Sequence, residues 1–129
     1  MGLYRTELER IGMLSMDSLR AARLVVDSGL HARGWSRQTA IDFLLEHTPL
    51  ERSNAEGEID RYIAVPGQAT SYMIGRLEIE RLRSLAQRHQ PQHFTISRFH
   101  EIVLNSGMVP LDDLARRVTE WISPPAAPG

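Results

Sequence analysis

The stretch "RYIAVPGQATSY", residues 61–72, contains side chains that bind and orient polar groups. A helix that starts at Pro66 would place Gln68 in its first turn, where free N–H groups and the positive end of the helix dipole point outward. Helical spacing puts Tyr72 on the same face as Gln68, and Arg76 less closely so. An amide, a phenol and a guanidinium at a helix start suit the binding of a carbonyl oxygen, a carboxylate or a developing oxyanion.

Arg61 and Tyr62 are candidates for the same place, because a short helix is predicted directly before Pro66. Packing is the competing explanation. Aromatic side chains at helical spacing are usually core residues, and Pro-Gly is then only a tight junction between two helices. On this segment alone the packing explanation is favoured, so a functional role needs support from the rest of the chain.

The hydrophobic pattern is helical nearly throughout, and no segment alternates as a strand does. It predicts an all-α fold of five or six helices in a single helical domain over residues 1–122. The Pro-rich tail, residues 123–129, is expected to be disordered.

Glycine, proline and capping residues predict where these helices begin and end. The first helix is predicted over about residues 4–27 and is expected to end in "SGLHARGW". "TPLERSNAEGE" is predicted to be a connection, and the longest helix is expected from Pro66 over about residues 67–88. Ser36 and Thr95 are predicted N-caps.

The composition excludes several classes of function. A chain of 129 residues with 15 basic and 16 acidic side chains has a net charge of −1, so it has no electrostatic grip on nucleic acid or on an anionic membrane. The absence of cysteine excludes disulfides and thiolate sites. No signal peptide and no apolar run near the ~20 residues of a membrane span is present, so a cytoplasmic protein is expected.

Three segments in order carry a family resemblance: "RAARLVVDSGLHARGWSRQTAIDFL", "EIDRYIAVPGQATSYMIGRLEIERLR" and "FTISRFHEIVLNSGMVPLDDLARRVTEWI". They resemble the C-terminal part of the bacterial family called domain of unknown function 885, over nearly the whole chain. The first two segments are highly specific, and the third is a weaker helical signature. That family in turn resembles the thermolysin-like zinc metallopeptidases. The resemblance therefore implies the C-terminal helical portion of a larger, mostly helical metallopeptidase-like fold.

The chain departs from the family pattern at the zinc site. Such proteins hold zinc with a His-Glu-x-x-His helix, and this sequence contains no such motif and no Gly-Trp-Ala segment. His89 and His93 have the required spacing, but Pro91 between them prevents the helix that would align them. We expect no metal or other cofactor in this chain, whereas the resemblance implies zinc and a peptide-like substrate for the complete protein.

The resemblance also implies roles for individual residues. It implies that His31 and Tyr72 are catalytic groups that stabilise the oxyanion, and that Arg61, Tyr62 and Gln68 bind the substrate or support the site. The function implied is that of a C-terminal fragment of a zinc-dependent peptidase-like hydrolase, inactive alone.

Arg23 and Asp27 lie four residues apart, so they are predicted to pair and to hold the helix that leads to His31. An exposed surface pair, worth only ~0.3–0.5 kcal/mol, is the alternative.

Two other functions remain open. The chain is a stand-alone helical interaction module, which predicts a homodimer or a defined partner, or it is a subunit of a split enzyme that needs a zinc-bearing N-terminal partner. Loss of a partner domain would leave apolar helix faces exposed, which favours association.

Overall fold

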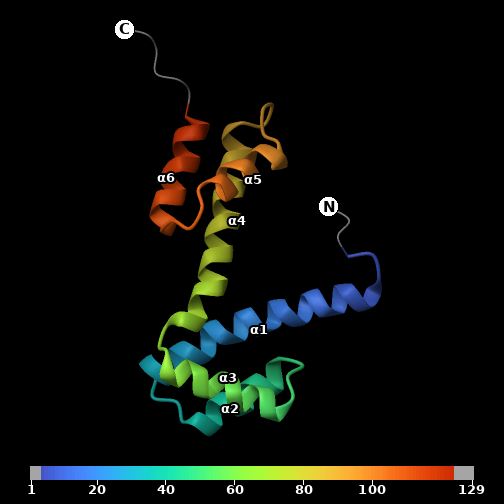
Figure 1. The fold of residues 1–129 in the computed structure, drawn as a ribbon, viewed down its shortest axis with the longest axis vertical. Helices are drawn as coiled ribbons and strands as arrows, with labels where there is room; N and C mark the ends of the chain where they lie inside the picture. The colour runs from blue at the N-terminus through green and yellow to red at the C-terminus, as the bar shows by residue number, and fades with distance from the viewer. Residues whose placement is uncertain (1–3, 124–129) are drawn as a thin grey trace. The chain divides into compact units, whose positions relative to one another are not determined.

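The computed structural model describes residues 4–123, which form six α-helices, one 3-10 turn and no strand (Figure 1). The predicted all-α fold of five or six helices is confirmed for this part of the chain. The elements are α1 (Glu7–Ala32), α2 (Arg37–His47), α3 (Arg52–Ala64), η1 (Gln68–Thr70), α4 (Ser71–His89), α5 (Ile96–Asn105) and α6 (Leu111–Ile122). Most of the tail that was predicted to be disordered, residues 124–129, lies outside the described residues.

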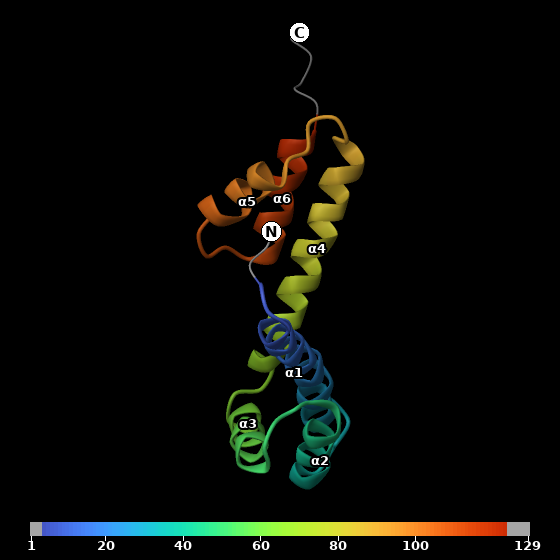
Figure 2. The ribbon, with the colours of Figure 1, turned by 90° about the vertical axis from the view of Figure 1, so that its right-hand side faces the viewer.

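The chain divides into two compact units, Met1–Ile74 and Gly75–Gly129. In the first unit, α2 and α3 pack against the carboxy-terminal half of α1 (Figures 1 and 2). The buried residues of this core begin at Leu19 on α1, and residues 7–18 lie outside it. The core consists of Leu19, Ala22, Val26, Ala40, Ile41, Leu44, Ala55, Ile59, Tyr62 and Ala69.

The first helix is longer than predicted. It begins at a capping box, in which the Thr6 hydroxyl accepts from the N–H of Glu9 and the Glu9 carboxylate accepts from the N–H of Thr6. It runs without interruption through Gly29, which was expected to end it. The absence of a side chain at Gly29 serves packing instead, because a Cβ there would lie 2.5 Å from the Trp35 ring. The helix ends before Gly34, whose φ is +68°.

The third helix is also longer than predicted, because α3 takes in residues 52–57 of the polar stretch that was expected to be a connection. Its buried face needs few apolar side chains, of which Ala55 and Ile59 are fully buried. On the exposed side, Arg37 on α2 forms a bidentate ion pair with Asp60 on α3, with N–O distances of 2.7 and 2.9 Å. The hydrophobic pattern was too sparse here to signal a helix.

The predicted N-caps are confirmed. Ser36 accepts from the N–H of Thr39, at 3.0 Å, and Thr95 accepts from the N–H of Arg98, at 3.3 Å. The prediction that one helix runs on from Pro66 is wrong. Gly67 takes a left-handed conformation with φ +80°, and the 3-10 turn η1 separates it from α4.

In the second unit, α4, α5 and α6 share a separate core made of Leu82, Ala86, Phe99, Leu114, Val118 and Ile122. Gln90, which follows α4, donates to the carbonyl of Trp121 near the end of α6, at 3.1 Å. None of the helices in residues 4–123 is both long enough and apolar enough to cross a membrane.

Candidate functional site

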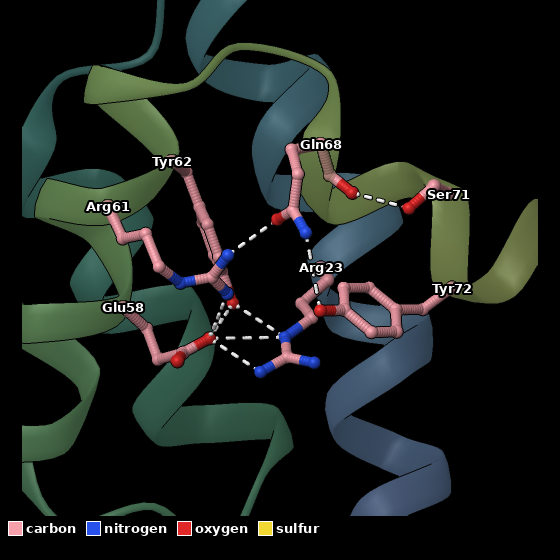
Figure 3. A network of polar contacts seen from close by, with 7 residues as sticks. All are labelled: Arg23, Glu58, Arg61, Tyr62, Gln68, Ser71 and Tyr72. Carbon is pink, nitrogen blue, oxygen red and sulfur yellow. Dashed lines mark hydrogen bonds and ion pairs between the residues drawn. The ribbon is translucent and has the colours of Figure 1, made fainter.

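A single carboxylate oxygen organises the polar side chains of the first unit. Glu58 lies on α3, and its Oε2 accepts hydrogen bonds from Nη2 of Arg23, at 2.8 Å, and from Nη2 of Arg61, at 3.0 Å. The Tyr62 hydroxyl, one turn along the same helix, donates to the same oxygen (Figure 3). One anion therefore joins two guanidinium groups and a phenol.

Arg23 connects this carboxylate to α1. Its Nε donates to the Tyr62 hydroxyl oxygen at 2.9 Å and lies 3.1 Å from Oε2 of Glu58. Burial alone would lower the pKa of Arg23, but the hydrogen bonds to Glu58 and Tyr62 outweigh it and raise the pKa further. The guanidinium is therefore charged, and it ties α1 to α3.

Glu58 is ionised and Tyr62 is neutral. Burial would raise the pKa of Glu58, but the hydrogen bonds from Tyr62, Arg23 and Arg61 outweigh it and hold the pKa below its usual range. Burial, followed by the hydrogen bond to Glu58, raises the pKa of Tyr62 to about 12. At neutral pH, Glu58 is therefore a carboxylate and Tyr62 a neutral phenol that donates to it.

Gln68 and Tyr72 extend the network to the surface. Arg61 donates through Nη1 to the side-chain oxygen of Gln68, at 2.5 Å, and the Gln68 amide donates to the Tyr72 hydroxyl, at 3.3 Å. The Arg23 guanidinium carbon lies 4.9 Å from the centroid of the Tyr72 ring, so Tyr72 contacts Arg23 as well as Gln68 (Figure 3). The structure thus brings together five predicted residues: Arg23, Arg61, Tyr62, Gln68 and Tyr72.

Asp27 has a different role from the predicted pairing with Arg23. It is buried, and both of its carboxylate oxygens accept from the N–H of Gly67, at 3.0 and 3.1 Å. Arg23 has Glu58 as its acidic partner instead. Ser71 donates to the carbonyl of Gln68 at 2.7 Å. These contacts fix the turn that carries Gln68.

His31 contacts the backbone of a network residue rather than one of its side chains. The Nε2 of His31, near the end of α1, lies 3.1 Å from the carbonyl oxygen of Tyr62. A carbonyl only accepts, so Nε2 carries the hydrogen of this contact, and in the neutral ring Nδ1 is then an acceptor on an exposed side chain. Arg76 pairs with Glu80 at 2.8 Å along α4.

The sequence analysis missed Glu58. A signal was present, because Glu58 precedes Arg61 by three residues and Tyr62 by four, which places all three on one face of a helix. Glu58 stands where the predicted connection, residues 48–58, meets the short helix predicted over about residues 58–64, and no role was predicted for it.

Among residues 4–123, no three His, Asp or Glu side chains come together as ligands for a metal ion. The network is also unsuitable for binding a metal ion, since its carboxylate, Glu58, is already bound by two guanidinium groups. The residues described here therefore do not fit a zinc site, and what the network itself supplies is oriented hydrogen-bond donors and charge.

The chain is similar to a solved bacterial structure and matches a protein family. The crystal structure of a provisionally named lipoprotein from Colwellia psychrerythraea superposes with a TM-score of 0.91 over 94% of this chain, at 40% identity. The chain spans 21% of that protein. The comparison with curated proteins gives no match. Residues 1–118 match a family described as "Bacterial protein of unknown function (DUF885)". Since that match covers most of the 129 residues, the chain belongs to the DUF885 family.

Proposed function

We propose that this chain is the C-terminal portion of a larger hydrolase of the zinc-metallopeptidase-like kind, inactive alone. It orients a peptide-like substrate and stabilises the oxyanion that forms in the reaction. The observation that carries the proposal is the Tyr72 hydroxyl, which lies on a side chain that is 42% exposed and is held in place by two other residues of the network.

The two tyrosines of the network differ in what their hydroxyl hydrogens do. Tyr62 is buried and gives its hydrogen to Glu58. Tyr72 accepts from the Gln68 amide, so its own hydrogen is available to a substrate oxygen. A phenol that is fixed at the surface and free to donate is the type of group that stabilises an oxyanion. This difference supports a catalytic role for Tyr72 and a supporting role for Tyr62.

The arginines supply position and charge. Arg23 lies against the Tyr72 ring, which restricts the ring and adds a cation–π attraction. Arg61 holds the Gln68 amide and is half-exposed, so it is suited to orient a carbonyl or carboxylate group of a peptide. In this proposal His31 is a second catalytic group, because its exposed ring presents Nδ1 as an acceptor.

The proposal requires a longer protein. The zinc would be held outside residues 4–123, in keeping with the chain's coverage of 21% of the Colwellia psychrerythraea protein. The zinc-bearing part is either joined to this chain or supplied as a separate N-terminal partner. The cytoplasmic location is part of the proposal. It has no support from the comparisons, because the relative carries the provisional name lipoprotein.

Peptide hydrolysis by the full-length Colwellia psychrerythraea relative tests this function. Phenylalanine at the position aligned with Tyr72 is expected to lower kcat by roughly 100-fold, with a small change in KM, since one oxyanion donor is lost. Asparagine at the position aligned with Asp60, an exposed residue of α3 outside the network, is the control. An unchanged kcat, or zinc-dependent hydrolysis by the isolated 129-residue chain, would contradict the proposal.

Large exposed apolar side chains on the first half of α1 favour a second candidate, a helical interaction module. It predicts a stable homodimer of the isolated chain or a defined partner complex. Sedimentation velocity of the 129-residue chain separates the two functions, because a monomer without a partner is inconsistent with the module.

A further inference from the structure

The first half of α1, residues 7–18, carries apolar side chains that the first unit does not cover. Leu8 is 78% exposed, Ile11 58%, Leu14 59% and Met16 45%. Figure 1 shows this part of α1 running past the ends of α2 and α3. We call residues 7–18 the leading segment. Four large exposed apolar residues within three turns are unusual on a surface that faces water.

The exposed residues cover too much of the helix for a single contact. At about 100° per residue, the arc from Leu14 through Ile11 and Leu8 to Met16 spans about 200°. A helix that packs on one neighbour needs an apolar stripe of about 100°. The leading segment therefore has the pattern of a helix that is enclosed from more than one side.

A hollow runs along the same segment and offers a place for partner side chains. It has a volume of about 430 Å³ and is lined by Tyr4, Glu9, Gly12, Met13, Met16 and Arg20. Glycine leaves space above the backbone, and methionine side chains adapt to the shape of what they contact. The hollow adds to the arc described above, so the surface has both exposed side chains and a depression.

We propose that the leading segment is a docking surface for apolar helices from the remaining portion of a DUF885 protein. A second copy of this chain fits less well, because pairing α1 with one other helix covers only one stripe. The relative offers the larger partner. It contains this fold at a TM-score of 0.91, and four-fifths of its chain lies outside the match. The inference rests on the proposed function only in that both require a longer protein.

Binding measurements test the surface. The 129-residue chain is immobilised, and the part of the Colwellia psychrerythraea relative outside the matched fifth is added as a separate polypeptide. The paired variant Leu8→Glu with Ile11→Glu is expected to bind at least roughly tenfold more weakly, because two apolar contacts are replaced by charges. Leu104→Glu, at another exposed apolar residue, is the matched control and is expected to bind like the unchanged chain.

Binding that the paired variant does not weaken would overturn the inference, as would no binding by the unchanged chain. A dimer of the chain alone that the paired variant abolishes would also overturn it in favour of a second copy. Should the separate polypeptide not stay in solution, glutamates at the two aligned positions of the full-length relative are expected to lower its Tm. An unchanged Tm would then count against the docking surface.

The outcomes for docking and for hydrolysis are distinguishable, because binding and Tm do not depend on catalysis. Binding through the leading segment without any peptide hydrolysis would keep the docking surface and remove the hydrolase. Hydrolysis that requires the residue aligned with Tyr72, in a protein insensitive to changes in the leading segment, would do the reverse.

Discussion

Glu58 accepts the hydroxyl hydrogen of Tyr62, and the two residues lie one turn apart on α3. The same carboxylate oxygen binds Arg23 from α1, so this pair also links the two helices. A single anion thus supports the packing of α1 on α3 and the ring of side chains that ends at Tyr72. Changes at Glu58 are therefore expected to affect both stability and the candidate site.

Replacement of Glu58 by glutamine is expected to lower the free energy of unfolding by about 1–3 kcal/mol, since two arginines lose their shared anion. Asp60→Asn is the matched control. It removes a carboxylate from the same helix, but the Asp60 side chain is 58% exposed, against 24% for Glu58, so the expected loss is below about 1 kcal/mol. Urea denaturation of both variants measures the difference, and equal losses would show that the Glu58 network adds no special stability.

The effect of Glu58 on stability depends on pH. Its pKa is lowered in the folded protein, so the stabilisation is present above the unfolded value of about 4.3 and is lost as pH falls through the lower folded value. The difference in stability between the original protein and Glu58→Gln is thus expected to be constant near neutral pH and to shrink below about pH 4. A difference that stays constant down to pH 3 would mean that the carboxylate charge contributes nothing.

Tyr62 gives a pH dependence at the alkaline end. Its pKa rises from 10.0 to about 12 on folding, so folding favours the protonated phenol. The stabilisation is complete below pH 10 and falls by about 2–3 kcal/mol as pH rises towards 12. The difference in absorbance at 295 nm between the original protein and Tyr62→Phe reports this phenol alone. A midpoint near pH 10 in the folded state would contradict the burial of Tyr62 together with its hydrogen bond to Glu58.

The sequence predicted the all-α fold and several helix ends, because caps such as Ser36 and Thr95 act within three residues. Five of the residues named from the sequence meet in one network, and Gln68 contacts Tyr72 although a 3-10 turn carries Gln68 in place of the predicted helix. What the sequence missed depends on distant contacts. Local patterns do not reveal that Asp27 binds Gly67, 40 residues away, or that Arg23 reaches Glu58, 35 residues away.

Two glycines behave differently from their prediction. Gly29 was predicted to end a helix, but it lies inside α1, where the Trp35 ring takes the place of a side chain. Gly67 was predicted inside a helix but takes a left-handed turn. Both conformations are compatible with the local sequence, and only contacts with other elements distinguish them.

Alanine at Gly29 is expected to destabilise the protein, although alanine is the better helix former. The new methyl group would lie 2.5 Å from two ring carbons of Trp35, so the ring must move. Such overpacking lowers the free energy of unfolding by about 1–3 kcal/mol. Thermal unfolding and tryptophan fluorescence measure the change. A stabilised variant with unchanged fluorescence would show that Trp35 does not pack on Gly29.

Alanine at Gly67 and at Gly57 is expected to change stability in opposite directions. An added Cβ has nothing within 4 Å at either position, so packing contributes little to the difference. Gly67 has φ +80°, which costs an alanine about 1–2 kcal/mol, whereas Gly57 lies inside α3, where alanine gains about 0.5–1 kcal/mol.

The midpoints of urea denaturation of Gly67→Ala and Gly57→Ala test these expectations. The result also bears on the candidate site, because the backbone amide of Gly67 is held by a buried side chain. Asp27 holds that amide, and the turn that follows presents Gln68 to Tyr72. Gly67→Ala is therefore expected to lower the midpoint and Gly57→Ala to raise it. If Gly67→Ala were neutral, the turn would not be left-handed in solution, and Gln68 would then begin an ordinary helix that Asp27 does not fix.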